Sequence, residues 1–153
     1  SLLSNSNPYT PAVNLVFALD EALKMMREEG LENIFLRHNK HKLAISNAVK
    51  ALNLELFADE NYLSPSITAI KTGEINAEEF RKTIKNKFDI LLAGGQDHLK
   101  GKIFRVGHLG YINDRDIITV ISAISKLLLD QNKITAQQVG EALLVASKYL
   151  ETD

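Results

Sequence analysis

Apolar residues in the first third of the chain recur at helical spacing and predict two long helices. One stripe, with intervals of three and four, consists of Ala12, Leu15, Val16, Leu19, Ala22, Leu23 and Met26. Pro11 stands where proline opens a helix, and Gly30 follows as a stop, so we expect a helix over residues 11–29. A second stripe consists of Ile34, His38, His41, Ile45, Ala48 and Leu52, and it predicts a helix over residues 31–52.

Shorter apolar runs follow, separated by turn residues, and these are typical of strands. They lie at residues 54–57, 66–71, 90–93 and 102–107. Capping signals predict three more helices: one from Asn76 to about residue 87, one from Asn113 to about residue 129, and one over residues 135–150 that Thr135 opens together with Gln138. The pattern therefore predicts an α+β fold, in which helices cover a small antiparallel or mixed sheet of four strands.

Composition then narrows the classes of function. A chain of 153 residues with 45% hydrophobic residues is long enough for one soluble globular domain. Its formal net charge of −1 leaves no basic surplus for nucleic acid, and no apolar run approaches the roughly 20 residues that cross a membrane. The absence of cysteine excludes disulfides, thiolate nucleophiles and cysteine-ligated metals, and it is compatible with the cytoplasm, where we expect the protein.

The most informative side chain is Arg105, which places a permanent charge in the middle of an apolar strand. A guanidinium offers donors in a rigid planar fork that matches a carboxylate, so we interpret Arg105 as the anchor for a small organic acid. Gly94 and Gly95 form a tight loop that we expect beside it, where the main chain can approach a ligand closely. The alternative is that Arg105 faces solvent from the open side of an antiparallel sheet.

Other polar residues have simpler explanations. His38 and His41 are three positions apart on a helix, but no carboxylate at a matching spacing completes a metal site, so we expect both to be packed and no metal to be bound. Asp114 and Asp116 lie in the first turn of a helix, where its dipole favours acidic residues. We find no pattern for a nucleophilic triad. The residues alone thus indicate a binding arginine without a reactive centre.

Several segments, taken in order, carry a resemblance to a known family. They are Thr10-Pro11, Glu29–Glu32 with Arg37-His38, Phe88–Ile90 running into Gly94-Gly95, and Phe104–Gly110. Together they resemble the C-terminal portion of class V pyridoxal-phosphate aminotransferases, in the alanine–glyoxylate and serine–pyruvate branch, over residues 9–129. Some cyanobacterial relatives are named soluble hydrogenase small subunits, a label to which a chain without cysteine gives no chemical support.

The resemblance implies that this chain supplies binding residues, whereas the catalytic residues lie outside it. It implies that Arg105 clamps the carboxylate of the amino acid or 2-oxo acid, and that Thr10, with Tyr9 close by, touches the cofactor phosphate bound by the neighbouring subunit. The family often has a tyrosine where this chain has Asn7. The lysine of the internal Schiff base and the aspartate that pairs with the pyridine nitrogen lie in the large domain of the family, so we expect this chain alone to be inactive.

On this interpretation, residues 1–10 are a loop left from the large domain and residues 11–153 are the small domain of a homodimeric transaminase that dimerises through its large domain. Residues 54–129 form the core of sheet and helices. Two alternatives stay open: a non-catalytic or regulatory module that binds a small acid through Arg105, and an electron-transfer or hydrogenase subunit, which would require a metal.

Overall fold

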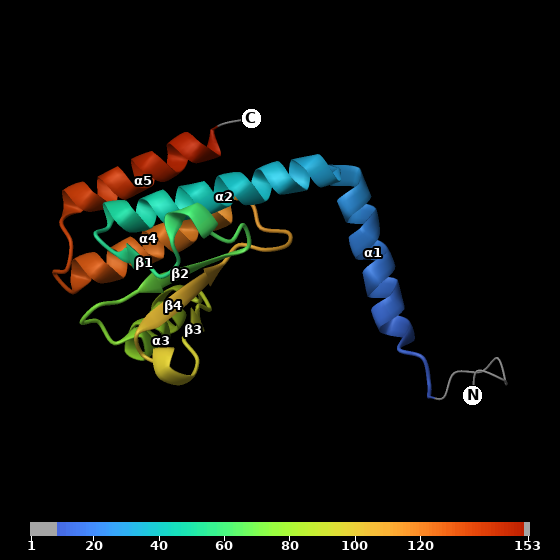
Figure 1. Ribbon diagram of the computed structural model, residues 1–153, viewed down its shortest axis with the longest axis horizontal. Coiled ribbons are helices and arrows are strands. Elements are labelled where there is room, and N and C mark those ends of the chain that lie inside the picture. The colour runs from blue at the N-terminus through green and yellow to red at the C-terminus, as the bar shows by residue number, and fades with distance from the viewer. Residues whose placement is uncertain (1–8, 152–153) are drawn as a thin grey trace. The chain divides into compact units, whose positions relative to one another are not determined.

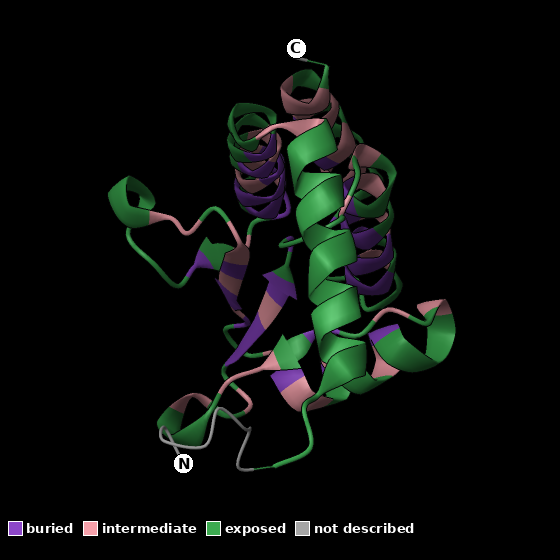
Figure 2. Cartoon of the chain, turned by 90° about the vertical axis from the view of Figure 1, so that its right-hand side faces the viewer, coloured by how far each residue is buried: buried purple, intermediate pink, exposed green. Residues whose placement is uncertain are grey.

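The computed structural model describes residues 9–151, and the chain divides after Leu36 into two compact units. In the N-terminal unit, α1 (Val13–Glu29) ends at Gly30, whose φ of 83° suits glycine. Ala12 occupies the N-cap position without a side-chain hydrogen bond. The predicted start at Pro11 is therefore two residues too early. None of the residues of α1 is buried, as its green ribbon in Figure 2 shows.

The second predicted helix is confirmed as α2 (Leu31–Ala51), and the other three follow their caps. Asn76 accepts hydrogen bonds from two backbone N–H groups at the start of α3 (Ala77–Phe88). Asn113 and Thr135 each form a complete capping box, at α4 (Asp114–Asp130) and at α5 (Ala136–Leu150). None of the helices within residues 9–151 is long and apolar enough to span a bilayer.

Four strands form one antiparallel sheet in the order β1-β2-β4-β3, which confirms the predicted α+β class. The strands are β1 (Glu55–Leu56), β2 (Ile67–Lys71), β3 (Ala93–Gly94) and β4 (Ile103–Gly107). Two 3-10 turns, η1 (Glu60–Tyr62) and η2 (Asp97–Leu99), lie in the connections. The predicted third strand is present, but its predicted bounds of 90–93 are wrong, because pairing starts only at Ala93 and includes Gly94.

The core lies between the helices and one face of the sheet. Ile70 of β2 and Phe104 and Val106 of β4 point into it, and the ring of Phe80 in α3 stacks on Phe104 with a centroid distance of 5.2 Å. Figure 1 shows α4 and α5 on this side of the sheet. Because side chains alternate along a strand, Arg105 points to the opposite face.

Candidate carboxylate-binding site

Arg105 lies at the centre of β4, between two other strands. Its neighbours across the ladder are Ala69 of β2 and Ala93 of β3. Residues directly opposite one another share a face of the sheet, so the two cross-strand neighbours of Arg105 are small side chains. The backbone of β4 is thus fixed from both sides, whereas the long side chain of Arg105 has small neighbours.

The guanidinium of Arg105 makes one hydrogen bond within residues 9–151. Its Nε donates a hydrogen bond of 2.9 Å to the carbonyl oxygen of Gly94, in a partly buried position. Among residues 9–151, no carboxylate forms an ion pair with Arg105 and no acceptor takes a hydrogen bond from its two Nη groups. The protein therefore holds the Nε side of the guanidinium, and the Nη groups have no acceptor among the described residues.

The protein's own packing requires Gly95, and it places the side chains of α3 close to Gly94. A Cβ atom on Gly95 would lie 2.1 Å from the carbonyl oxygen of Leu99, and one on Gly94 would lie 2.5 Å from Nη1 of Arg81. The sequence-based interpretation was that these glycines let the main chain approach a ligand. The structure gives Gly95 an intramolecular reason, and it places the Gly94 carbonyl against Arg105.

Thr10 and Tyr9 lie in the N-terminal unit and are exposed, and Asn7 lies outside the described residues. The Thr10 hydroxyl makes no hydrogen bond to any residue of the described part of the chain, so it can donate to a phosphate. A single hydroxyl does not make a phosphate site, however, so the described residues do not by themselves fit pyridoxal phosphate. The roles of Thr10, Tyr9 and Asn7 stay predictions.

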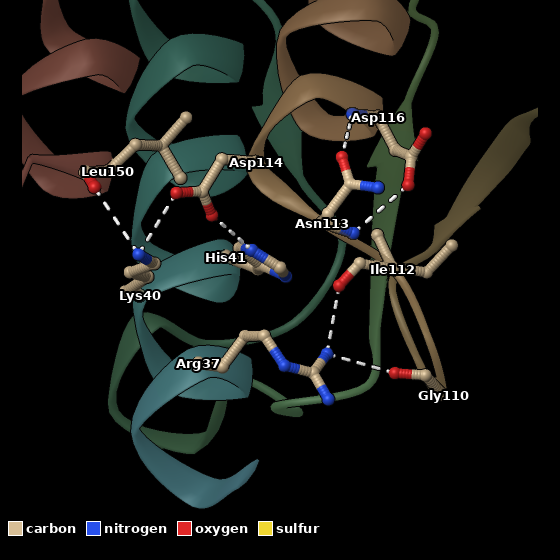
Figure 3. A network of polar contacts seen from close by, with 9 residues as sticks. All are labelled: Arg37, Lys40, His41, Gly110, Ile112, Asn113, Asp114, Asp116 and Leu150. Atoms are coloured by element: carbon tan, nitrogen blue, oxygen red, sulfur yellow. Dashed lines mark hydrogen bonds and ion pairs between the residues drawn. The ribbon is translucent and has the colours of Figure 1, made fainter. Parts of the chain in front are cut away.

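The loop after β4 is held by two residues of α2, of which Figure 3 draws Arg37. Nη1 of Arg37 donates to the carbonyl oxygens of Gly110 and Ile112, both at 2.9 Å, and the N–H of Gly110 donates to Nε2 of His38 at 3.3 Å. Gly110 has a φ of 89°, which a residue with a side chain rarely adopts. These contacts fix the backbone of the segment that connects the Arg105 strand to α4.

Next to this loop, Asp114 ties the start of α4 to α2 (Figure 3). Its carboxylate accepts a hydrogen bond of 2.8 Å from Nε2 of the fully buried His41 and one of 3.0 Å from Nζ of Lys40. Burial lowers the pKa of His41, although Asp114 opposes the change. Burial raises the pKa of Asp114, but the hydrogen bonds from His41 and Lys40 outweigh it and leave that pKa below its ordinary value.

His108, one residue beyond β4, is also fully buried. Its Nε2 forms a hydrogen bond of 2.9 Å with the hydroxyl of Thr68 on β2. Burial lowers the pKa of His108 to about 4, against an opposing effect of the Pro65 carbonyl, so the ring is neutral at pH 7. The packed role predicted for His38 and His41 is confirmed, and the described residues contain no group of three or more His, Asp or Glu side chains able to hold a metal.

Sequence reasoning missed Arg37, Lys40 and His108 as parts of this network, and it explained Asp114 by the helix dipole alone. The available signal was the run of charged and imidazole side chains from Arg37 to His41, which interrupts an apolar helix stripe. Their partners lie about 70 positions later in the chain, so no local spacing reveals the pairing.

Comparisons with known proteins place this site in a family context. No protein-family model matches the chain. A protein of Synechococcus sp. described as "Soluble hydrogenase, small subunit" is 49% identical over 97% of this chain and 38% of its own length. Serine–glyoxylate aminotransferase of Arabidopsis thaliana is 32% identical over 94% of this chain and 36% of its own length.

A crystal structure of ureidoglycine–glyoxylate aminotransferase from Bacillus subtilis matches with a TM-score of 0.83 and 32% identity, over 92% of this chain and 37% of that one. The chain therefore spans little more than a third of the length of the relatives that it matches. Over nearly its whole length, it corresponds to the C-terminal portion of class V aminotransferases, in the serine– and alanine–glyoxylate branch.

Proposed function

We propose that the chain is the substrate-clamping domain of a homodimeric, pyridoxal-phosphate-dependent transaminase of the cytoplasm. In this proposal residues 11–153 form the small domain, and residues 1–10 belong to a loop of the large domain. The reaction moves an amino group between a small amino acid and a 2-oxo acid such as pyruvate or glyoxylate. The relatives from Arabidopsis thaliana and Bacillus subtilis, both named for glyoxylate, support this choice of acceptor.

The observation that carries the proposal is the half-satisfied guanidinium of Arg105. The Gly94 carbonyl takes its Nε hydrogen and leaves the Nη groups without a protein acceptor among the described residues. A carboxylate that binds there gains a charge-assisted contact worth about 1.5–3 kcal/mol. The rigid strand also fixes the direction of the bound acid, and such orientation lowers the barrier for a reaction at the adjacent carbon.

In this proposal the cofactor and Arg105 contribute different parts of the reaction. Pyridoxal phosphate, when bound to the complete enzyme, supplies the electron sink for the reaction at the α-carbon. Arg105 contributes binding and orientation, and Ala69 and Ala93 leave room for the acid beside it. We expect the chain alone to be inactive, because the resemblance places the lysine of the internal Schiff base in the large domain.

The test is Arg105→Lys in the full-length enzyme. An ammonium group keeps the charge but cannot copy the planar fork, so we expect a higher KM for the 2-oxo acid and a lower kcat. Arg115→Lys, at an exposed position in the first turn of α4, is the matched control and should leave both constants unchanged. Unchanged kinetics for Arg105→Lys would show that Arg105 does not bind the acid.

A second candidate function follows from the name of the Synechococcus relative, a soluble hydrogenase subunit. Hydrogenase or electron-transfer chemistry requires a metal centre. Elemental analysis and an absorption spectrum of the full-length protein separate the two functions. A stoichiometric transition metal would support the hydrogenase assignment, whereas the yellow colour of bound pyridoxal phosphate would support the transaminase. A colourless protein that still binds the acid would instead be a regulatory module.

A further inference from the structure

A second arginine, Arg81 of α3, bonds to the residue before β3. β3 is the strand whose Gly94 carbonyl accepts the hydrogen bond from Arg105. The Nε of Arg81 donates a hydrogen bond of 2.8 Å to the carbonyl oxygen of Leu92, immediately before β3. Its Nη1 lies 2.9 and 3.0 Å from the two carboxylate oxygens of Glu78, one turn earlier on the same helix. The side chains of Arg81 and Glu78 are 23% and 39% exposed, so this contact is partly shielded from water. Arg81 therefore joins α3 to the start of β3.

The strand that Arg81 holds is short and lies at the edge of the sheet. β3 has two residues, and it pairs with β4 alone. Edge segments with so few ladder hydrogen bonds open easily unless other contacts hold them. The bond from Arg81 to Leu92 supplies such a contact, and it comes from the helix side rather than from the sheet.

The pair of Arg81 and Glu78 also packs directly on Gly94. A Cβ atom on Gly94 would lie 2.5 Å from Nη1 of Arg81 and 2.8 Å from a carboxylate oxygen of Glu78. The carbonyl of the same glycine accepts the hydrogen bond from Nε of Arg105. A continuous series of contacts thus leads from Glu78 through Arg81 and β3 to the guanidinium that faces the open side of the sheet.

We propose that Arg81 and Glu78 are positioning residues: by holding β3 in place, they keep the Gly94 carbonyl on Nε of Arg105 and so aim the Nη groups at a carboxylate. Arg81 does not touch the ligand in this arrangement. The positioning effect is a property of this chain, while the identity of the ligand rests on the proposed function.

The physical basis is the freedom of an arginine side chain. Arg105 has many rotamers, and a single hydrogen bond at Nε removes most of the directions in which the fork can point. If β3 moves away, Arg105 keeps its charge but loses its preferred direction. Lysine at position 81 can donate to Leu92 or to Glu78, but it lacks the planar fork that serves both at once.

Hydrogen exchange at Nε of Arg105 measures this effect directly. In the ¹⁵N-labelled 153-residue chain, NMR follows the Nε–H group of each arginine. We expect Arg81→Met to speed exchange at Nε of Arg105 by roughly three- to tenfold, the range that the loss of one hydrogen bond represents. Arg81→Lys should give a smaller increase, and Arg115→Met, at an exposed position, should give none.

Two further variants test the route through Gly94. Gly94→Ala should speed the same exchange, because the new methyl group displaces Arg81. Combined with Arg81→Met it should add little, since the colliding guanidinium is then gone. Exchange of the Phe104 amide and the thermal unfolding midpoint report whether the core stays folded. A folded Arg81→Met variant with unchanged exchange at Arg105 would overturn the proposal, as would full additivity of the two substitutions.

The full-length enzyme extends the test to the ligand. Arg81→Met should raise KM for pyruvate or glyoxylate several-fold with a smaller change in kcat, because the reacting groups are untouched. If Arg81→Met alters exchange at Arg105 while neither acid shifts the Arg105 signals of the full-length protein, the positioning role stands and the proposed function fails. If the acids shift these signals equally in wild type and Arg81→Met, with equal affinity, the positioning role fails.

Discussion

Arg105 and Arg37 are both partly buried arginines of the same unit, yet their surroundings differ in one decisive respect. Arg37 donates to two backbone carbonyl oxygens of the loop after β4. Arg105 donates to one carbonyl through Nε, and its Nη groups have no acceptor in the described part of the chain. The comparison shows two uses of a guanidinium: that of Arg37 is bonded to the backbone of a loop, whereas that of Arg105 is bonded only at Nε, which is why we propose Arg105 and not Arg37 as the ligand-binding residue.

The largest expected effect is kinetic and concerns Arg105. Arg105→Ala in the full-length enzyme should lower kcat/KM for the 2-oxo acid by roughly 10- to 150-fold, which corresponds to the loss of about 1.5–3 kcal/mol of a charged contact. The free energy of unfolding should change by less than about 1 kcal/mol, because only one hydrogen bond to the protein is lost. Steady-state kinetics and urea unfolding measure the two quantities. A large loss of stability with intact kinetics would show that Arg105, like Arg37, stabilises the fold and does not bind the acid.

The buried histidines beside Arg37 should make the fold sensitive to acid. The pKa of His108 is lowered by burial from 6.5 to about 4, so between these values the unfolded chain binds more protons than the folded one. The contribution of His108 to stability should therefore be constant above pH 6.5, fall as the pH drops toward 4, and level off below it, with a total loss of roughly 3 kcal/mol from this residue. The lowered pKa of His41 acts in the same direction.

Urea unfolding at a series of pH values measures this loss. His108→Gln should flatten the dependence between pH 4 and 6.5, because the glutamine amide does not titrate. His98→Gln, at an exposed position, is the control and should keep the wild-type slope. An unchanged slope for His108→Gln would show that His108 does not cause the acid sensitivity.

Arg37→Ala should act on the fold rather than on ligand binding. Two hydrogen bonds to Gly110 and Ile112 are lost, and we expect a decrease of about 2 kcal/mol in the free energy of unfolding. Urea unfolding of the 153-residue chain provides the measurement, with Arg115→Ala as a surface control. If Arg37→Ala left stability intact and instead abolished carboxylate binding, the contrast between the two arginines would be reversed.

The smallest expected effect concerns Thr10. Thr10→Val should leave the unfolding free energy of the chain within about 0.5 kcal/mol, because Ala12 and not Thr10 occupies the N-cap of α1. In the full-length enzyme, the same substitution should weaken retention of pyridoxal phosphate on dialysis, which its absorbance records. Equal retention of pyridoxal phosphate by the variant and the wild type would show that the Thr10 hydroxyl does not contact the cofactor.

Local signals were sufficient for most of the fold. The caps at Asn76, Asn113 and Thr135 act within three residues of themselves, so the sequence showed where α3, α4 and α5 begin. The apolar run at residues 90–93 misled the strand assignment because the Leu92 carbonyl bonds to Arg81 of α3 instead of to a strand. Apolar composition does not reveal whether a backbone carbonyl accepts its hydrogen bond from a neighbouring strand or from a side chain.

The candidate site shows the same limit. Arg105 could be singled out from its strand, since a charge within an apolar run is a local anomaly. Its surroundings could not be found in the same way, because they join segments that are distant in sequence. Examples are the hydrogen bonds from Arg105 to Gly94, from Arg81 to Leu92 and from Arg37 to Gly110. Such contacts depend on how the strands and helices pack, so only the three-dimensional structure shows them.

The two alanines beside Arg105 have a consequence for engineering. Ala69 and Ala93 flank the guanidinium on the two neighbouring strands and hold no charge of their own. Bulkier or smaller residues at these two positions would narrow or widen the space around a bound acid while the grip on its carboxylate stays the same. If the proposed function holds, selectivity for acid size can be tuned at these two positions separately from affinity for the acid group.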